Sequence, residues 1–121
     1  MIEAVHHVQV SIPVGSEDEA RSFYCGVLGM TEIPKPDPLA GRGGFWLELD
    51  GFQIHFGVED GIDRSRSKAH VAYRVTDLDG WRDKLTAAGC EVIDGIEIPG
   101  CDRFEFRDPF GNRVEFMQLF S

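Results

Sequence analysis

The chain repeats its own pattern at an offset of about 60 residues. Each half is expected to run as a strand, a helix, a strand and a hairpin. Gly29 of the first half matches Gly89 of the second, and His55 matches Glu115. His7 matches His70 after a slip of three residues. We therefore expect a duplicated βαβββ module, at 1–60 and 67–121, with both modules forming one domain over 1–121.

The length and net charge of the chain exclude some classes of protein. The 121 residues suffice for one domain with a real core. The net charge of −9 argues against a nucleic-acid partner, because phosphate contacts need a basic patch. The sequence contains neither a run of about 18 apolar residues nor a signal-peptide pattern, so we expect no membrane span. Three cysteines without C-x-x-C spacing indicate free thiols in a reducing compartment, and hence the cytoplasm.

Two helices are predicted from their end signals and apolar spacing. Ser16 and Glu19 form a capping-box pattern, and Gly29 ends the first helix. Thr76 or Asp77 caps the second helix, which ends at Gly89. The apolar stripes are Ala20, Phe23, Tyr24, Val27 and Leu28 in the first helix, and Leu78, Trp81, Leu85 and Ala88 in the second.

Two hairpins set the strand register. Asp50-Gly51 is a strong two-residue turn signal, which pairs Leu49 with Phe52 and therefore places Trp46 opposite His55. The segment "DPFG", 108–111, predicts a type I turn followed by a bulge at the glycine. That turn pairs Asp108 with Asn112, and so places Glu105 opposite Glu115.

Strand alternation then assigns side chains to faces. Val8 and Val10 belong to the helix-covered face, and His6 shares their parity. The polar face receives four potential ligands, which are His7, His55, His70 and Glu115. The expected core of the hairpins is Phe45, Leu47, Leu49, Phe52, Ile54, Phe56, Phe104, Phe106, Val114 and Phe116.

Three imidazoles and a carboxylate are ligands for a divalent metal. They suit Zn, Ni, Co, Mn or Fe(II), and two His with one carboxylate and open positions suit a non-haem iron centre. A single His on a solvated strand face is more often an ordinary surface residue. The coincidence of four such residues under the repeat favours metal binding.

Four stretches resemble the vicinal oxygen chelate superfamily, which includes glyoxalase, extradiol dioxygenase and bleomycin-resistance proteins. They are "VHHVQVSI", "FYCGVLGM", "AHVAYRVTDLD" and "DPFGNRVEF". The resemblance implies an α+β fold in which paired βαβββ modules form a cup-shaped mixed sheet around a metal. Its usual ligand positions match His7, His70 and Glu115. A fourth matches His55, where glyoxalase I often carries a glutamate. Small members are often homodimers with the cup built across both chains.

The resemblance also implies a chemistry and an alternative to it. In the enzymes, the metal acts as a Lewis acid on two neighbouring oxygens of a small substrate. The reaction is of lyase, isomerase, dioxygenase or thiol-transferase type, and the fold alone does not choose among these. Bleomycin-resistance members instead bind a small molecule without metal. The complete set of four polar residues favours the enzyme.

Three further residues are candidates for the site. Glu105 would stand beside Glu115, and like charges opposed across a strand pair are destabilising unless a metal or a proton relieves them. Glu105 is therefore the candidate catalytic acid or base. The alternative is that Arg103, Arg107 and Arg113 simply neutralise it. Trp46 and Arg103 are candidate substrate contacts or, equally, part of a dimer interface.

Overall fold

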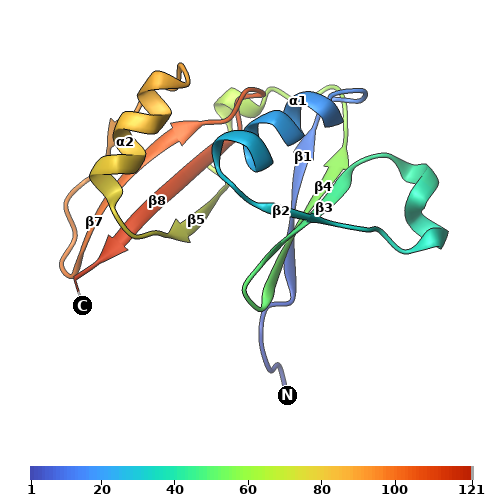
Figure 1. Ribbon diagram of the computed structural model, residues 1–121, viewed down its shortest axis with the longest axis horizontal. Coiled ribbons are helices and arrows are strands. Elements are labelled where there is room, and N and C mark those ends of the chain that lie inside the picture. Colours follow the sequence, from blue (N-terminus) through green and yellow to red (C-terminus); the bar gives the residue numbers. More distant parts are fainter. Residues whose placement is uncertain (121) are drawn as a thin grey trace. The chain divides into compact units, whose positions relative to one another are not determined.

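A computed structural model describes residues 1–120. Contacts divide the chain into two compact units, unit 1 (Met1–Ile62) and unit 2 (Asp63–Ser121). Each unit, taken by itself, is a four-stranded mixed sheet with helix packed on it, in the strand order β1-β4-β3-β2 or β5-β8-β7-β6 (Figure 1). The predicted α+β class with tandem βαβββ modules is therefore confirmed.

Unit 1 begins with a strand and a helix whose second half is a π-helix. Its elements are β1 (His7–Ile12), α1 (Glu17–Arg21), the π-helix η1 (Ser22–Val27), β2 (Thr31–Ile33), the 3₁₀ helix η2 (Asp37–Arg42), β3 (Phe45–Leu49) and β4 (Phe52–Val58). Strand β1 pairs in parallel with β4, whereas the other pairs are antiparallel.

Unit 2 repeats this order with a longer regular helix. Its elements are the 3₁₀ helix η3 (Arg64–Arg66), β5 (His70–Arg74), α2 (Leu78–Ala87), β6 (Ile93–Asp94), β7 (Cys101–Arg107) and β8 (Arg113–Leu119). Strand β5 pairs in parallel with β8, so the first and last strands of this unit are also neighbours.

Both hairpins have the predicted register. Trp46 pairs with His55 across β3 and β4, and Glu105 pairs with Glu115 across β7 and β8. The second turn closes as expected, since the Asp108 N–H donates to the Asn112 carbonyl at 2.8 Å. Gly111 has a φ of 97°, which is the left-handed conformation that a glycine bulge requires.

The helix-covered face of each sheet forms the core. Tyr24 packs on Phe56 with ring centroids 4.6 Å apart, and Trp81 meets Phe116 edge-on at 5.2 Å. The buried apolar residues are Ile12, Ala20, Phe23, Tyr24, Leu28, Phe45, Leu47, Ile54 and Phe56 in unit 1, and Tyr73, Leu78, Leu85, Cys101, Phe104, Phe106, Val114 and Phe116 in unit 2.

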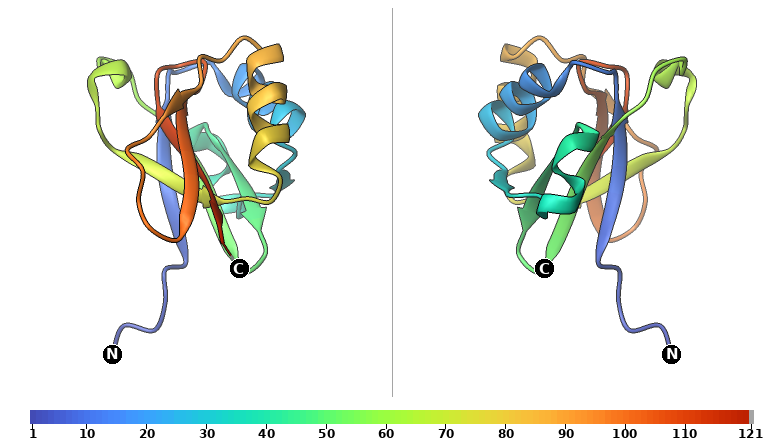
Figure 2. Two further views of the ribbon diagram at one scale, coloured as in Figure 1. Left: turned by 90° about the vertical axis from the view of Figure 1, so that its left-hand side faces the viewer. Right: turned by 90° about the vertical axis from the view of Figure 1, so that its right-hand side faces the viewer.

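Two residues differ in exposure from the sequence expectations. His6 lies before β1 and is exposed, so it does not join the covered face. Ala88 is also exposed, because the α2 helix ends at Ala87. Figure 2 shows the N-terminal segment before β1 running away from the strands that follow it.

The two helices start differently. Ser16 makes no capping bond; its hydroxyl donates to the Pro13 carbonyl at 2.6 Å, so the predicted capping box is wrong. Its backbone (φ −101°, ψ 12°) is outside the extended region from which a capping side chain reaches the first turn. Asp77 does cap α2, because its side chain accepts from the Gly80 N–H at 3.2 Å.

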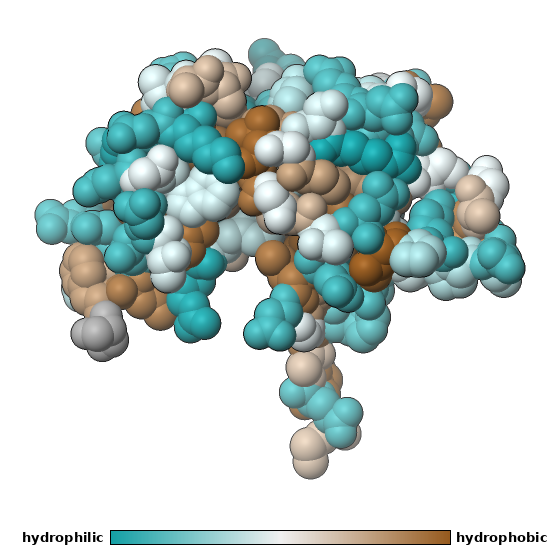
Figure 3. All heavy atoms as spheres, viewed as in Figure 1, coloured by the Kyte–Doolittle hydropathy of each residue, from teal (hydrophilic) through white to brown (hydrophobic). Residues whose placement is uncertain are grey.

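The surface over both helices is mostly hydrophilic (Figure 3). This agrees with the acidic composition of the chain. Within residues 1–120, no helix is long and apolar enough to cross a membrane.

Candidate functional site

The polar face of unit 1 carries a stack of three rings. The Trp46 and His55 rings are 3.8 Å apart and 2° from parallel, and the His55 and His7 rings are 4.0 Å apart and 16° from parallel. The strand order places β3, β4 and β1 side by side, so residues of one parity from these strands are neighbours. His55, in the middle of the stack, is only 5% exposed.

His55 is held as a neutral imidazole. Burial, together with charge on His7 and His6, lowers the pKa of His55 to about 4. Its Nε2 atom lies 2.8 Å from Gln53 Oε1. Because an amide oxygen only accepts, Nε2 carries the proton and Nδ1 carries the lone pair. His55 therefore has one nitrogen available as an acceptor or as a metal ligand.

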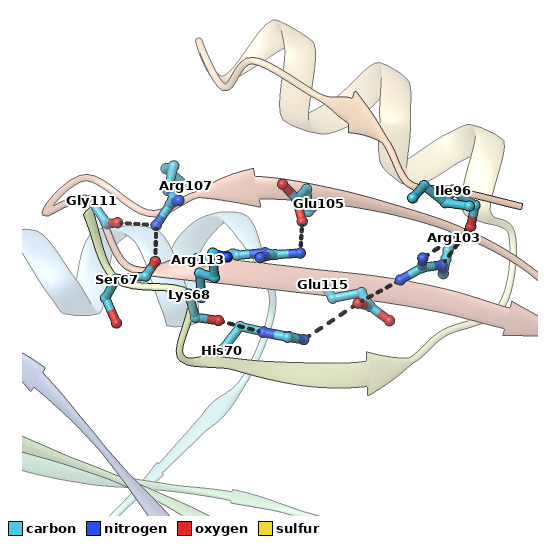
Figure 4. Close-up of polar contacts among 10 residues, drawn as sticks. All are labelled: Ser67, Lys68, His70, Ile96, Arg103, Glu105, Arg107, Gly111, Arg113 and Glu115. Atoms are coloured by element: carbon cyan, nitrogen blue, oxygen red, sulfur yellow. Dashed lines mark hydrogen bonds and ion pairs between the residues drawn. The ribbon is translucent and has the colours of Figure 1, made fainter. Parts of the chain in front are cut away.

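The polar face of unit 2 is built around a buried carboxylate. Glu115 is 7% exposed, and its Oε1 accepts from Arg103 Nη1 at 3.2 Å. His70 Nε2 lies 3.5 Å from the same oxygen (Figure 4). The parallel pairing of β5 with β8 explains this approach, because it sets Ala72 beside Glu115 and His70 two residues earlier on the same face.

The orientation of His70 points its free nitrogen at Glu115. Its Nδ1 lies 2.9 Å from the Lys68 carbonyl oxygen, and a carbonyl can only accept, so Nδ1 carries a proton. In the neutral ring, Nε2 then presents a lone pair to a carboxylate oxygen. An imidazole nitrogen and a carboxylate oxygen that face each other in this way are both donor atoms that a divalent metal ion accepts.

The three arginines of β7 and β8 are each engaged by the protein. Arg103 also donates from Nε and Nη2 to the Ile96 carbonyl, at 3.1 and 2.9 Å. Arg113 pairs with Glu105, and its buried Nε has no hydrogen-bond partner among the described residues. Arg107 donates to the Ser67 and Gly111 carbonyls at 3.0 and 3.1 Å (Figure 4).

The predicted site residues thus form one cluster within each unit. Trp46, His55 and His7 lie together in unit 1, and His70, Glu115 and Arg103 lie together in unit 2. Glu105 is paired with Arg113, although its backbone stands opposite Glu115. Within residues 1–120, no three His, Cys, Asp or Glu side chains gather closely enough to hold a metal ion.

Residues 4–116 match the family model of the Glyoxalase/Bleomycin resistance protein/Dioxygenase superfamily. The chain belongs to this superfamily.

Similar proteins agree with this assignment. The chain is 29% identical to a "Probable lactoylglutathione lyase" of Synechocystis sp., over 91% of this chain and 92% of that protein. A crystal structure of a "putative glyoxalase family protein" from Bacillus anthracis has 45% identity and a TM-score of 0.91, covering 99% of this chain and 98% of that one. The fosfomycin resistance protein FosX from Listeria monocytogenes, complexed with Mn(II) and sulfate, shares the fold at 15% identity and a TM-score of 0.80, covering 99% and 93%.

This glyoxalase-superfamily chain also has a pocket that the sequence did not indicate. It has a volume of about 500 Å³ and lies entirely in unit 1, beside the ring stack. Its lining includes His7, Trp46, His55, Lys35, Leu39 and Arg42. The last three come from the segment 34–44, which is rich in Pro and Gly and reads simply as a loop. The sequence did contain one signal for this pocket. It is the presence of basic residues in a long loop that follows a strand.

Proposed function

We propose that the protein is a metal-dependent enzyme that acts on a small molecule through two neighbouring oxygens, in a reaction of lyase type. Superfamily membership and the relative named as a lactoylglutathione lyase support this reaction class. The Mn(II) in the FosX complex supports a divalent metal. The candidates remain Fe, Mn, Ni, Co and Zn, all of which accept imidazole and carboxylate ligands.

The observation that carries the proposal is the pair of His70 and Glu115. The Lys68 carbonyl fixes the ring so that its lone pair faces a buried carboxylate, as is typical of metal-binding histidines. The ligands would be His70 and Glu115 of unit 2 with His7 of unit 1, and His55 as a fourth, from one chain or from two. When bound, the metal would stabilise negative charge on a substrate oxygen.

The remaining residues have roles that follow from their contacts. Arg103 holds Glu115 in place through Nη1 while the Ile96 carbonyl anchors the rest of its guanidinium, so Arg103 would reach the substrate only indirectly. Glu105 is the candidate base, and its ion pair with Arg113 holds the carboxylate in a fixed position on the polar face. Trp46 offers a flat apolar surface to the substrate beside His55.

Metal content tests the proposal directly. Protein purified without chelator, and apo-protein reloaded with each candidate metal, should carry about one ion per site by elemental analysis. His7→Ala and Glu115→Gln should lose it. Glu48→Gln is the matched control, because it changes an exposed carboxylate of β3 that the proposal does not use. Equal metal retention by His7→Ala, Glu115→Gln and wild type would refute the metal site.

Turnover tests the lyase assignment and the base. The assay follows formation of the S-lactoylglutathione thioester from methylglyoxal and glutathione. Glu105→Gln should retain metal and lower turnover with an altered pH–rate profile. Asp102→Asn changes an exposed carboxylate elsewhere on β7 and should behave as wild type. Loss of metal in Glu105→Gln would instead make Glu105 a ligand.

A metal-free binding protein of the bleomycin-resistance type is the second candidate. Arg103 together with a protonated His70 would satisfy Glu115 without any metal. Under this alternative, chelation would leave the melting temperature unchanged, while small ligands would still raise it.

We also propose that the enzyme is a cytoplasmic homodimer. Each four-stranded sheet ends in edge strands, β1 and β2 in unit 1 and β5 and β6 in unit 2, whose backbone groups favour further pairing. Sedimentation at micromolar concentration should give the dimer mass.

A further inference from the structure

The pocket of unit 1 is basic although the protein is acidic. The chain has a net charge of −9, yet the pocket is lined by the side chains of Lys35 and Arg42 and by no Asp or Glu. A cavity of about 500 Å³ is of the size that small-molecule sites usually have. Charge of one sign, opposite to that of the whole protein, indicates that the pocket takes an anion.

The loop that carries these cations is fixed by close backbone contacts. Lys35 Nζ donates to the Gly43 carbonyl at 2.6 Å, and the Gly44 N–H donates to Glu17 Oε2 at 3.2 Å. A Cβ on Gly44 would lie 1.9 Å from the Phe56 carbonyl oxygen, so only glycine permits the approach of the loop to β4. Figure 2 shows η2, which ends at Arg42, as the turquoise turn beside the strands of its sheet.

Arg42 is the unused charge in this arrangement. Its side chain is exposed, and within residues 1–120 no hydrogen bond or ion pair involves its guanidinium. By contrast, Arg21, the other arginine of unit 1, is paired with Glu32 and Asp18. Lys35 keeps two further N–H groups beyond its bond to Gly43. A planar guanidinium binds a carboxylate through two parallel hydrogen bonds.

The rings that line the pocket favour a conjugated ligand. Its lining includes Trp46, His55 and His7, whose stacked rings continue across the polar face. Leu39 and Val58 add apolar surface. Offset stacking on such rings favours a planar, conjugated group.

We propose that this pocket binds the carboxylate end of a planar, conjugated acid, with Arg42 on the carboxylate and the plane of the molecule against Trp46. As an assignment of substrate class, this rests on the proposed function. As a binding site, it requires no metal, since neither Arg42 nor Trp46 is a ligand. A carboxylate is favoured over a phosphate because its plane can match the planar guanidinium of Arg42 while the conjugated part of the same flat molecule lies against Trp46.

The test uses benzoate as the probe with chelator-treated protein. Titration is followed by the indole N–H signals in NMR spectra, because the chain has two tryptophans and Trp81 of unit 2 serves as an internal reference. We expect benzoate to shift the Trp46 signal saturably and to leave the Trp81 signal unmoved. Benzamide, its neutral analogue, should bind about tenfold more weakly, and phenyl phosphate should not bind more tightly than benzoate.

Variants separate charge from shape. Arg42→Gln should weaken benzoate about tenfold without changing benzamide binding, and Arg42→Lys should fall between that variant and wild type. Arg66→Gln, at an exposed arginine of unit 2, is the matched control and should bind as wild type.

Several outcomes would overturn the proposal: equal binding of benzoate and benzamide, unchanged affinity in Arg42→Gln, tighter binding of phenyl phosphate, or equal shifts at both tryptophans. Because the measurement is made without metal, its failure leaves the metal-content test of the proposed function intact. Failure of the metal-content test likewise leaves this binding site standing.

Discussion

The polar faces of the two units use the same backbone for different chemistry. At the repeat position where unit 1 has His55, unit 2 has Glu115, and the residues paired across the hairpin are Trp46 and Glu105. Unit 1 therefore presents stacked rings, whereas unit 2 presents carboxylates paired with arginines. The register is conserved between the units because turns and core residues set it, and the polar face is left free to differ.

The loops before the two hairpins differ in the same way. In unit 1, the segment 34–44 forms the basic pocket, with Arg42 unpaired within the described chain. In unit 2, the shorter segment 95–100 offers the Ile96 carbonyl to Arg103, which also holds Glu115. Unit 1 thus keeps a cation available to a ligand, and unit 2 commits its cation to a neighbouring carboxylate.

The largest predicted loss of stability comes from removing a core phenylalanine, and it should be equal in the two units. Phe56 and Phe116 occupy equivalent positions in β4 and β8, and each is 2% exposed. Phe56→Ala and Phe116→Ala should each lower the free energy of unfolding by about 4 kcal/mol through the cavity that they leave. Urea denaturation measures both. A difference of more than about 2 kcal/mol would show that the cores are not equivalent.

The next effect is specific to unit 1. Gly44→Ala should cost about 3 kcal/mol, because the new Cβ would collide with the Phe56 carbonyl and the φ of 78° is unfavourable for alanine. Gly51→Ala, with a φ of 73° and open space around its Cβ, is the matched control and should cost about 1 kcal/mol. Similar melting temperatures for the two variants would contradict the close approach of the loop to β4.

Arg103 of unit 2 should contribute to the stability of the protein. Arg103→Met keeps the aliphatic stem but leaves Glu115 with His70 alone, and should cost about 2 kcal/mol. In the Glu115→Gln background, the same change should cost less, and the double-mutant cycle gives the coupling. Gln53→Met in unit 1 removes a neutral hydrogen bond to His55 and should cost about 1 kcal/mol. If the stability losses of Arg103→Met and Glu115→Gln were additive, the pairing of the two residues would be contradicted.

The smallest effect distinguishes the helix starts. Asp77→Ala should cost about 1.5 kcal/mol, because it removes a cap and places alanine at a φ of 55°. Asp77→Asn should retain most of the stability, since asparagine both caps and tolerates this conformation. Ser16→Ala should cost only about 0.5 kcal/mol, because Ser16 bonds to a loop carbonyl and not to the helix. A larger loss at Ser16 than at Asp77 would reverse this comparison.

The features that were predicted correctly from the sequence are those that turns and strand alternation control. Asp50-Gly51 and "DPFG" specify both hairpin registers, so the pairs Trp46–His55 and Glu105–Glu115 followed directly. The core followed for the same reason, since Phe45, Ile54, Phe104 and Phe116 lie on the parity that the helices cover. The superfamily was also predicted correctly from its stretches.

Features that depend on side-chain torsions or on irregular backbone could not be predicted from the sequence. Alternation places His55 on a face, but it does not say that the ring is sandwiched between Trp46 and His7. Nor does it say which arginine takes Glu105, because Arg103, Arg107 and Arg113 share one parity. The sequence at Ser16 matches the capping-box pattern, yet the backbone torsions there direct the hydroxyl to the Pro13 carbonyl.

The π-helix η1 bears on how the duplicated halves diverged. In it, the Leu28 N–H donates to the Phe23 carbonyl, five residues back, so the turn holds one residue more than an α-helical turn. The stretch from His7 to Gly29 in unit 1 is three residues longer than the stretch from His70 to Gly89 in unit 2. Two of these residues precede the helix and one lies within it. The extra helical residue is what a single-codon insertion would leave when the flanking core contacts must be kept. An alignment of the halves should therefore open one gap inside the helix, between Arg21 and Leu28.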